Sequence, residues 1–217
     1  MVEENRSGTV TEGEAETALK ATERLAFFSD AVVAIAITLL AIDLPLPTGS
    51  TTGEFLASMS EDSFDYLAFL ISFLVIGSHW RVHHSVFRHV RRADGAVVLL
   101  NQLWLLLVVL TPFFTRVLAD GESVTFVRFA LYAIAQALQL ITMAAIVAVI
   151  ARRGWFAPTA PTSLARRGWV GSLIVAVSFL VSVPVFLLVG SWAFALWAVL
   201  PAVLERALSR AGVVAPQ

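Results

Sequence analysis

The sequence contains no cysteine and few charged residues. None of its 217 residues is cysteine, so disulfide bonds and thiolate metal sites are excluded. Only 14% of the residues are charged, whereas a soluble domain of this size has about 25%. The 15 Lys and Arg nearly balance the 16 Asp and Glu, so no basic surface for nucleic acid is expected. These shortages argue against a soluble or nucleic-acid-binding protein.

Motifs of the common enzyme classes are also absent. The sequence has no Walker A loop, no G-x-S-x-G and no H-E-x-x-H. No stretch carries a regular row of arginines, so a voltage sensor is not expected. We therefore predict neither an enzyme nor a bound cofactor.

Apolar residues, in contrast, make up 58% of the chain. They gather in six runs that approach or exceed the roughly 20 residues needed to cross a bilayer. The fold class predicted is all-α, a polytopic membrane protein with six transmembrane helices in one domain, residues 21–210. The predicted spans are 25–44, 64–86, 96–118, 125–151, 169–189 and 192–208. The acidic, polar residues 1–20 are expected to form a disordered cytoplasmic tail, and residues 211–217 a C-terminal tail.

Positive charges predict the orientation of these spans. Lysine and arginine cluster before the first span and after the second, fourth and sixth, and are sparse in the other connections. Because short cytoplasmic connections carry the excess of positive charge, both termini are expected to be cytoplasmic. The first outer loop is acidic, and Glu54 and Asp62 in it could enrich cations outside.

The first span has an aliphatic stripe with a single hydroxyl. Residues three, four and seven positions apart share one face of a helix. The stripe consists of Phe28, Val32, Ile35, Thr38, Leu39 and Ile42, with Arg24 at its cytoplasmic end. Ordinary helix packing would account for it. Alternatively, several copies of the span line a pore, because hydrophobic constrictions can gate by dewetting.

Asp30 is a charge inside this span. Such a charge costs roughly 3 kcal/mol on insertion scales, so it indicates a role in function or assembly. Asp30 lies about 140° around the helix from Ile35. Bonding to the second span or to the start of a neighbouring helix is therefore favoured over cation binding in a pore. His79, Arg81 and His83 of the second span are expected at a similar depth.

Several other polar residues lie within predicted spans. No carboxylate adjoins His79 and His83, so no metal site is predicted; a hydrogen-bonding role in packing is favoured, with pH sensing as the alternative. Asn101 and Trp104 share a face of the third span and are expected to hydrogen-bond between helices. The same interpretation applies to Gln136 and Gln139 in the fourth span.

The pattern R-x-x-x-F-S-D, followed by A-V-x-A-I-A-I-T-L-L, resembles the signature of the transmembrane-protein-175 family. The resemblance continues through ISFLVIGSHWRVHHSVF and LNQLWLLLVVLTPF and covers residues 22–118. Members of this family are potassium-permeable channels of endosomes and lysosomes, with shorter prokaryotic relatives. The single copy of the signature resembles the prokaryotic form, which implies a homotetramer in the plasma membrane of a prokaryote.

The resemblance also implies roles for residues of the first span. Ile35 matches the pore constriction, with Leu39 and Ile42 as further layers, and Thr38 matches a threonine implicated in selectivity. The signature residues are expected to hold the cytoplasmic helix ends in register: Arg24, Phe28, Ser29 and Asp30. A supporting polar network is expected from His79, Arg81, His83, Asn101 and Trp104.

The function expected from residues and resemblance together is a potassium-permeable cation channel. Its partners would be further copies of itself, the lipid bilayer and potassium ions. The loop T-V-G-Y-G is absent, so rings of backbone carbonyls are not its filter. Two alternatives stay open: a proton-permeable channel or proton-coupled transporter, with Asp30 and the histidines as relay, and a non-conducting membrane scaffold.

Overall fold

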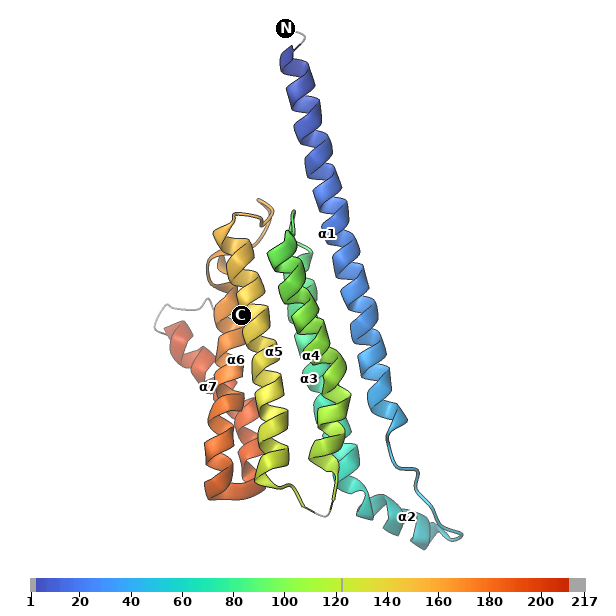
Figure 1. The fold of residues 1–217 in the computed structure, drawn as a ribbon. Coiled ribbons are helices and arrows are strands. Elements are labelled where there is room, and N and C mark those ends of the chain that lie inside the picture. The colour runs from blue at the N-terminus through green and yellow to red at the C-terminus, as the bar shows by residue number, and fades with distance from the viewer. Residues whose placement is uncertain (1–2, 122, 211–217) are drawn as a thin grey trace.

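The computed structural model describes the backbone of residues 3–121 and 123–210, and the side chains of 12–121, 123–164, 168–204 and 206–207. The described chain is all-helical and elongated, with its long helices side by side (Figure 1). Five segments are long and apolar enough to cross a membrane: 12–42, 63–87, 95–119, 126–152 and 168–204. These segments support a multi-pass membrane protein.

The first helix, α1, runs over Glu3–Ile42 and is 40 residues long. It extends well beyond the other helices at its N-terminal end (Figure 1). Residues 3–20 are therefore helical here, in place of the disordered tail expected for 1–20. Side-chain contacts one helical turn apart favour the helix here. For example, Lys20 Nζ donates to Glu16 Oε1 at 2.6 Å.

The loop after α1 contains a short helix, α2 (Thr52–Glu61), which sequence reasoning missed. Thr51 and Glu54 form a capping box at the start of α2. The side chain of each residue accepts a hydrogen bond from the backbone N–H of the other. The carboxylate of Glu54 also accepts from the backbone N–H of Ser50 at 2.7 Å. Glu54 is thus engaged in a helix cap.

The next three helices begin and end within one residue of the predicted spans. They are α3 (Ser63–Phe87), α4 (Gly95–Ala119) and α5 (Phe126–Arg152). Asp94 caps α4, its Oδ1 accepting from the N–H groups of Ala96 and Val97. The turns α3–α4 and α5–α6 meet in an antiparallel bridge between Val90 and Phe156.

The C-terminal part differs from the prediction. Helix α6 (Thr162–Val189) is followed by a 3₁₀ helix, η1 (Gly190–Ala195), and by α7 (Leu196–Arg210), which returns along α6 (Figure 1). The three elements together contribute one membrane segment, 168–204, so five candidates stand against six predicted spans. Helix α7 has only 15 residues and contains Pro201, which leaves it short of a full span. Residues 211–217 lie outside the described part.

Two apolar clusters hold the helices together. One lies among α1, α3, α4 and the C-terminal half of α5, and includes Val33, Ile76 and Trp104. The other joins α5 to α6 and α7, where Phe129 stacks on Phe186 with ring centroids 4.5 Å apart. Helix α5 makes its largest contacts with α4 and α6, whereas α1 contacts α3 and α4. One side of α1 is therefore left without a partner in the single chain.

Candidate functional site

Helix α1 divides into a buried face and an exposed face. Ser29, Val33, Ala36 and Leu40 are buried. Their spacing of four, three and four residues places them on the side that meets α3 and α4. A second side, about 120° around the helix from the first, carries the predicted stripe, with Phe28 52%, Ile35 60%, Leu39 38% and Ile42 74% exposed. These side chains do not pack within the chain, and their assignment to a pore stays a prediction.

Thr38 and Arg24 lie on the same exposed side, and Val32 at its edge is half-buried. The hydroxyl of Thr38 donates to the carbonyl of Ile35 at 2.8 Å. Its proton is therefore directed into the helix, and its oxygen lone pairs are left to accept from outside. A ring of such threonine hydroxyls would offer hydrogen-bond acceptors but no donors.

Asp30 lies off this stripe and contacts α3. The indole Nε1 of Trp80 donates to Asp30 Oδ1 at 2.9 Å, and His84 Nδ1 lies 3.7 Å from Oδ2. The structure thus pairs Asp30 with the second predicted span, as expected. The partners differ from the expected ones, because Trp80 and His84 are one turn apart on the face of α3 that meets α1.

Three members of the predicted supporting network meet in the interior. Asn101 Nδ2 donates to Ser29 Oγ at 2.9 Å, and His83 Nε2 lies 2.9 Å from Asn101 Oδ1. Because the amide oxygen can only accept, the His83 tautomer carries its proton on Nε2. Trp104 stacks on the His83 ring at 4.4 Å. Ser29, His83 and Asn101 are fully buried, so these bonds fasten α1 to α3 and α4.

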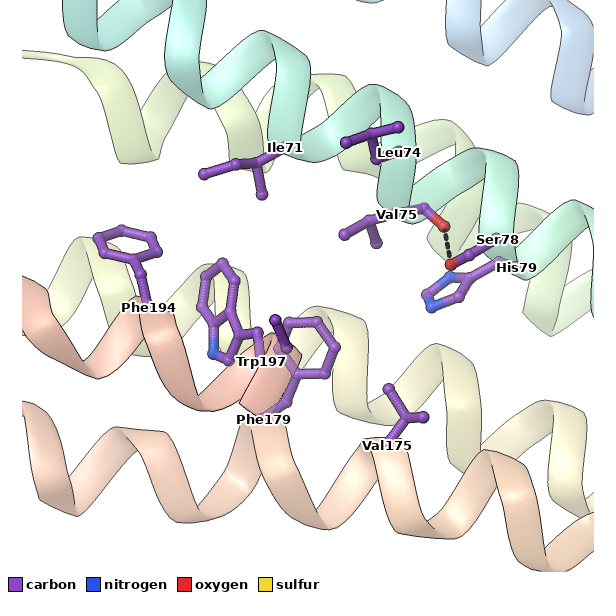
Figure 2. A pocket seen from close by; sticks show the side chains of 10 residues that line it. Ile71, Leu74, Val75, Ser78, His79, Val175, Phe179, Phe194 and Trp197 are labelled. Carbon is purple, nitrogen blue, oxygen red and sulfur yellow. Dashed lines mark hydrogen bonds between the residues drawn. The ribbon is translucent and has the colours of Figure 1, made fainter. Parts of the chain in front are cut away.

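The other two members do not join them. Arg81 is exposed. His79 is buried on another side of α3, where it faces Gln139 of α5 and lines a cavity beside α6 and α7 (Figure 2). Among the residues whose placement is described, no group of three His, Cys, Asp or Glu is arranged to hold a metal ion.

The far end of α1 is held by contacts that sequence reasoning missed. Arg116 Nη1 of α4 donates to Asp43 Oδ1 at 2.6 Å, just after α1 ends. The hydroxyl of Tyr66 donates to the carbonyl of Pro45 at 2.9 Å. The signal available in sequence was Arg116, one of the few basic residues at the outer ends of the predicted spans. The predicted outer acid Asp62 directly precedes α3 and makes no side-chain cap bond there.

Comparisons with known proteins agree with the resemblance. Residues 24–112 match the sequence model of a family described as the endosomal/lysosomal potassium channel TMEM175. A potassium channel of Streptomyces collinus is 42% identical over 97 residues, which are 45% of this chain and 47% of that protein. The human endosomal/lysosomal proton channel TMEM175 is 40% identical over 94 residues, 40% of this chain and 19% of that protein. The chain thus spans about half the length of the bacterial relatives it matches in sequence, 47% and 50% for the first two.

A solved structure extends the similarity beyond these residues. The crystal structure of a lysosomal potassium-selective channel TMEM175 homolog from Chamaesiphon minutus matches with a TM-score of 0.63 at 29% identity. The match covers 87% of this chain and 98% of that chain. The structural match therefore extends well beyond residues 24–112, which the family model matches.

Proposed function

We infer that this chain, which belongs to the TMEM175 family through its residues 24–112, is a subunit of a potassium-permeable cation channel. The observation that carries the proposal is the exposed stripe of α1, which stands on the family's signature helix and has no partner in the chain. An aliphatic stripe alone would suit lipid. Arg24 and Thr38 on the same side favour a face that meets water and ions.

The proposed assembly is a homotetramer with four copies of α1 around a central axis. Ala31, Ala34 and Ala41 lie beside the stripe and are exposed. Small residues allow close approach of helices in a membrane, so this edge would accept the α1 of a neighbouring copy. Each subunit would have six spans, the last formed by η1 and α7 together. Both termini would face the cytoplasm of a prokaryotic cell, following the positive-inside rule.

In this arrangement Ile35, Leu39 and Ile42 form successive apolar rings that narrow the pore. A cation must lose water to pass them, or the rings must widen. The Thr38 hydroxyls supply oxygen acceptors one helical turn from Ile35, because their protons are donated to the Ile35 carbonyls. Acceptors without free protons favour cations over anions, which supports a selectivity role for Thr38 without a carbonyl filter.

Asp30 and Ser29 have a structural role in this proposal. Asp30 bonds to Trp80 of α3, and Ser29 bonds to Asn101 of α4. Both bonds lie away from the exposed stripe. These bonds fix the rotation of α1 about its own axis. The rotation decides which side chains reach the central axis.

The test is cation flux through purified protein in liposomes. Ile35→Asn should raise potassium flux by on the order of tenfold, since lowering a barrier by about 1.4 kcal/mol has this effect. Leu106→Asn is the matched control, because Leu106 of α4 is also an exposed apolar residue, 53% accessible. Equal leaks in both variants, or no flux in the wild-type protein, would contradict the proposal and favour a non-conducting scaffold.

Proton permeation is the second candidate, because relatives in several vertebrates are named proton channels and His84 lies near Asp30. The two buried histidines of α3 do not extend this pair into a relay. His83 bonds to Asn101, and His79 lies on another side of α3. Reversal potentials that follow a proton gradient, and ignore a potassium gradient, would favour this candidate.

A further inference from the structure

A cavity of about 250 Å³ lies between α3, α6, η1 and α7 (Figure 2). Its walls include Val75, Ser78 and His79 of α3, Phe179 of α6, Phe194 of η1 and Trp197 of α7. No residue of α1 lines it. The cavity is therefore separate from the exposed stripe of α1.

One end of the cavity is polar. His79 points from α3 toward α6 in Figure 2 and is only 5% exposed. Its Nδ1 is fully enclosed and has no hydrogen-bond partner, whereas the other ring nitrogen points away from Ser78 in Figure 2. The neighbouring Ser78 donates its hydroxyl proton to the carbonyl of Val75 at 2.7 Å, which leaves its oxygen lone pairs unused. The cavity thus offers an imidazole and a hydroxyl oxygen at a single end.

The other end is aromatic and apolar. Phe194 and Phe179 lie around Trp197, with ring centroids 4.8 Å from the indole in each case. The Nε1 of Trp197 donates to Ser182 Oγ at 2.8 Å. Because its N–H is engaged, the indole presents only an apolar surface to the cavity.

We propose that this cavity binds a neutral, membrane-soluble molecule that has a two-ring apolar body and one hydroxyl. The rings lie between Phe179, Phe194 and Trp197, and the hydroxyl bonds to the His79 imidazole. A dry apolar cavity of about 150 Å³ accepts benzene, so the larger volume here suits two fused rings. A hydroxyl can donate or accept, and it therefore fits either tautomer of His79. A lipid acyl chain would fill the volume and form no hydrogen bond at the polar end.

The proposal goes beyond ion conduction and does not depend on it. Its test is binding of radiolabelled 2-naphthol to the full-length protein in lipid nanodiscs, with empty nanodiscs as background and naphthalene as the matched probe. The wild-type protein should bind 2-naphthol about 3- to 10-fold more tightly than naphthalene, the ratio expected from one net hydrogen bond. Equal affinities would overturn the proposal and favour an acyl chain as occupant.

Variants separate the polar anchor from the volume. His79→Phe keeps a planar ring and should reduce the affinity for 2-naphthol to that for naphthalene. Val75→Phe fills the cavity and should abolish specific binding of both probes. Leu103→Phe is the control, because Leu103 is an exposed residue of α4 outside the cavity. An unchanged affinity ratio in His79→Phe, or unchanged binding in Val75→Phe, would contradict the assignment.

A measurement on the wild-type protein covers the case in which a variant fails to fold. A photoactivatable diazirine derivative of 2-naphthol should label residues 71–79 and 175–198, and the label should be competed by 2-naphthol. Competed labelling only elsewhere, for example within residues 28–42, would overturn the site. The Ile35→Asn variant should bind 2-naphthol normally, so a failed conduction proposal and a failed binding proposal remain distinguishable.

Discussion

Helices α1 and α5 are both long and apolar, yet they use their residues in opposite ways. In the most apolar 18-residue window of α1 only 22% of the residues are buried, against 67% in α5. Helix α1 exposes large aliphatic side chains and buries Ser29 in a hydrogen bond to Asn101. Helix α5 buries most of this window, including Gln136 and Gln139, whose amide atoms have no partner among the described residues.

The difference concerns what holds each helix in place. Helix α5 is held by its extensive packing against α4 and α6. Apolar packing of this kind is strong but does not depend on the orientation of individual groups. Helix α1 packs on one side only, and a few directional bonds fix its rotation: those of Ser29, Asp30 and Asp43. Replacing the polar residues that hold α1 should therefore lower the stability of the protein. Replacing the buried glutamines of α5 by apolar residues should change its stability little.

The largest expected effect follows from breaking the buried bond of α1. Asn101→Leu leaves His83 Nε2 buried without a partner and leaves Ser29 Oγ with only its bond to Leu25 O, which should cost about 2–4 kcal/mol of unfolding free energy. Denaturant unfolding in detergent measures the loss. Gln102→Leu is the control, because Gln102 is exposed next to it and should change stability little. Similar losses in both variants would show that the bonds of Asn101 contribute nothing specific.

A smaller effect is expected at Asp30. Trp80→Phe removes the donor to Asp30 Oδ1 and should cost about 1–2 kcal/mol, whereas Asp30→Asn keeps an oxygen acceptor and should cost less. Unfolding of both variants and their ion selectivity should be measured together. Altered selectivity of Asp30→Asn in an intact oligomer would reject the structural role and place this residue in the ion path.

The contrasting substitution lies in α5. Gln136→Met keeps the shape of the side chain and removes a buried amide without partners, so stability should be unchanged or higher by up to about 1 kcal/mol. Gln139→Met should behave in the same way. A loss of more than about 1 kcal/mol in both would mean that these amides are hydrogen-bonded in the assembled protein, and the contrast with α1 would be lost.

The smallest effect is expected at the exposed end of α1. Arg116→Gln removes the ion pair with Asp43, in which both side chains are largely exposed, so the loss should stay below about 0.5 kcal/mol. The loss should become smaller at about 1 M salt, because salt weakens ion pairs between exposed side chains. The melting temperature in low and high salt checks this. A large loss that persists in salt would make Asp43 as important for α1 as Ser29.

Much of the fold could be predicted from hydropathy and charge. The ends of α3, α4 and α5 follow from apolar runs bounded by charged or turn-forming residues. Helix α2 was missed although Thr51 and Glu54 have the spacing of a capping box. The last predicted span is not confirmed as a separate segment, because hydropathy only counts apolar residues, whereas the 3₁₀ helix with Pro201 beyond it shortens the α-helical part.

The candidate site was predictable only where a helix has distinct faces. Periodicity placed Ile35, Leu39 and Ile42 on a single side of α1, and the structure leaves that side uncovered. Helix α3 is apolar nearly all round, so its sequence does not reveal which side meets α1. Trp80 was therefore missed as the partner of Asp30. The hydrogen bonds expected for Gln136 and Gln139 are also not found among the described side chains.

The bridge between Val90 and Phe156 has a mechanical consequence. Arg91 donates its backbone N–H to Trp155 O at 2.9 Å, and Ala157 donates to His89 O at 2.7 Å. These bonds lock the α3–α4 hairpin to the α5–α6 hairpin at one end, and the chain itself joins α4 to α5 at the other. A pair of hairpins tied at both ends resists splaying and sliding. We therefore expect any large displacement to involve α1, which packs on one side only.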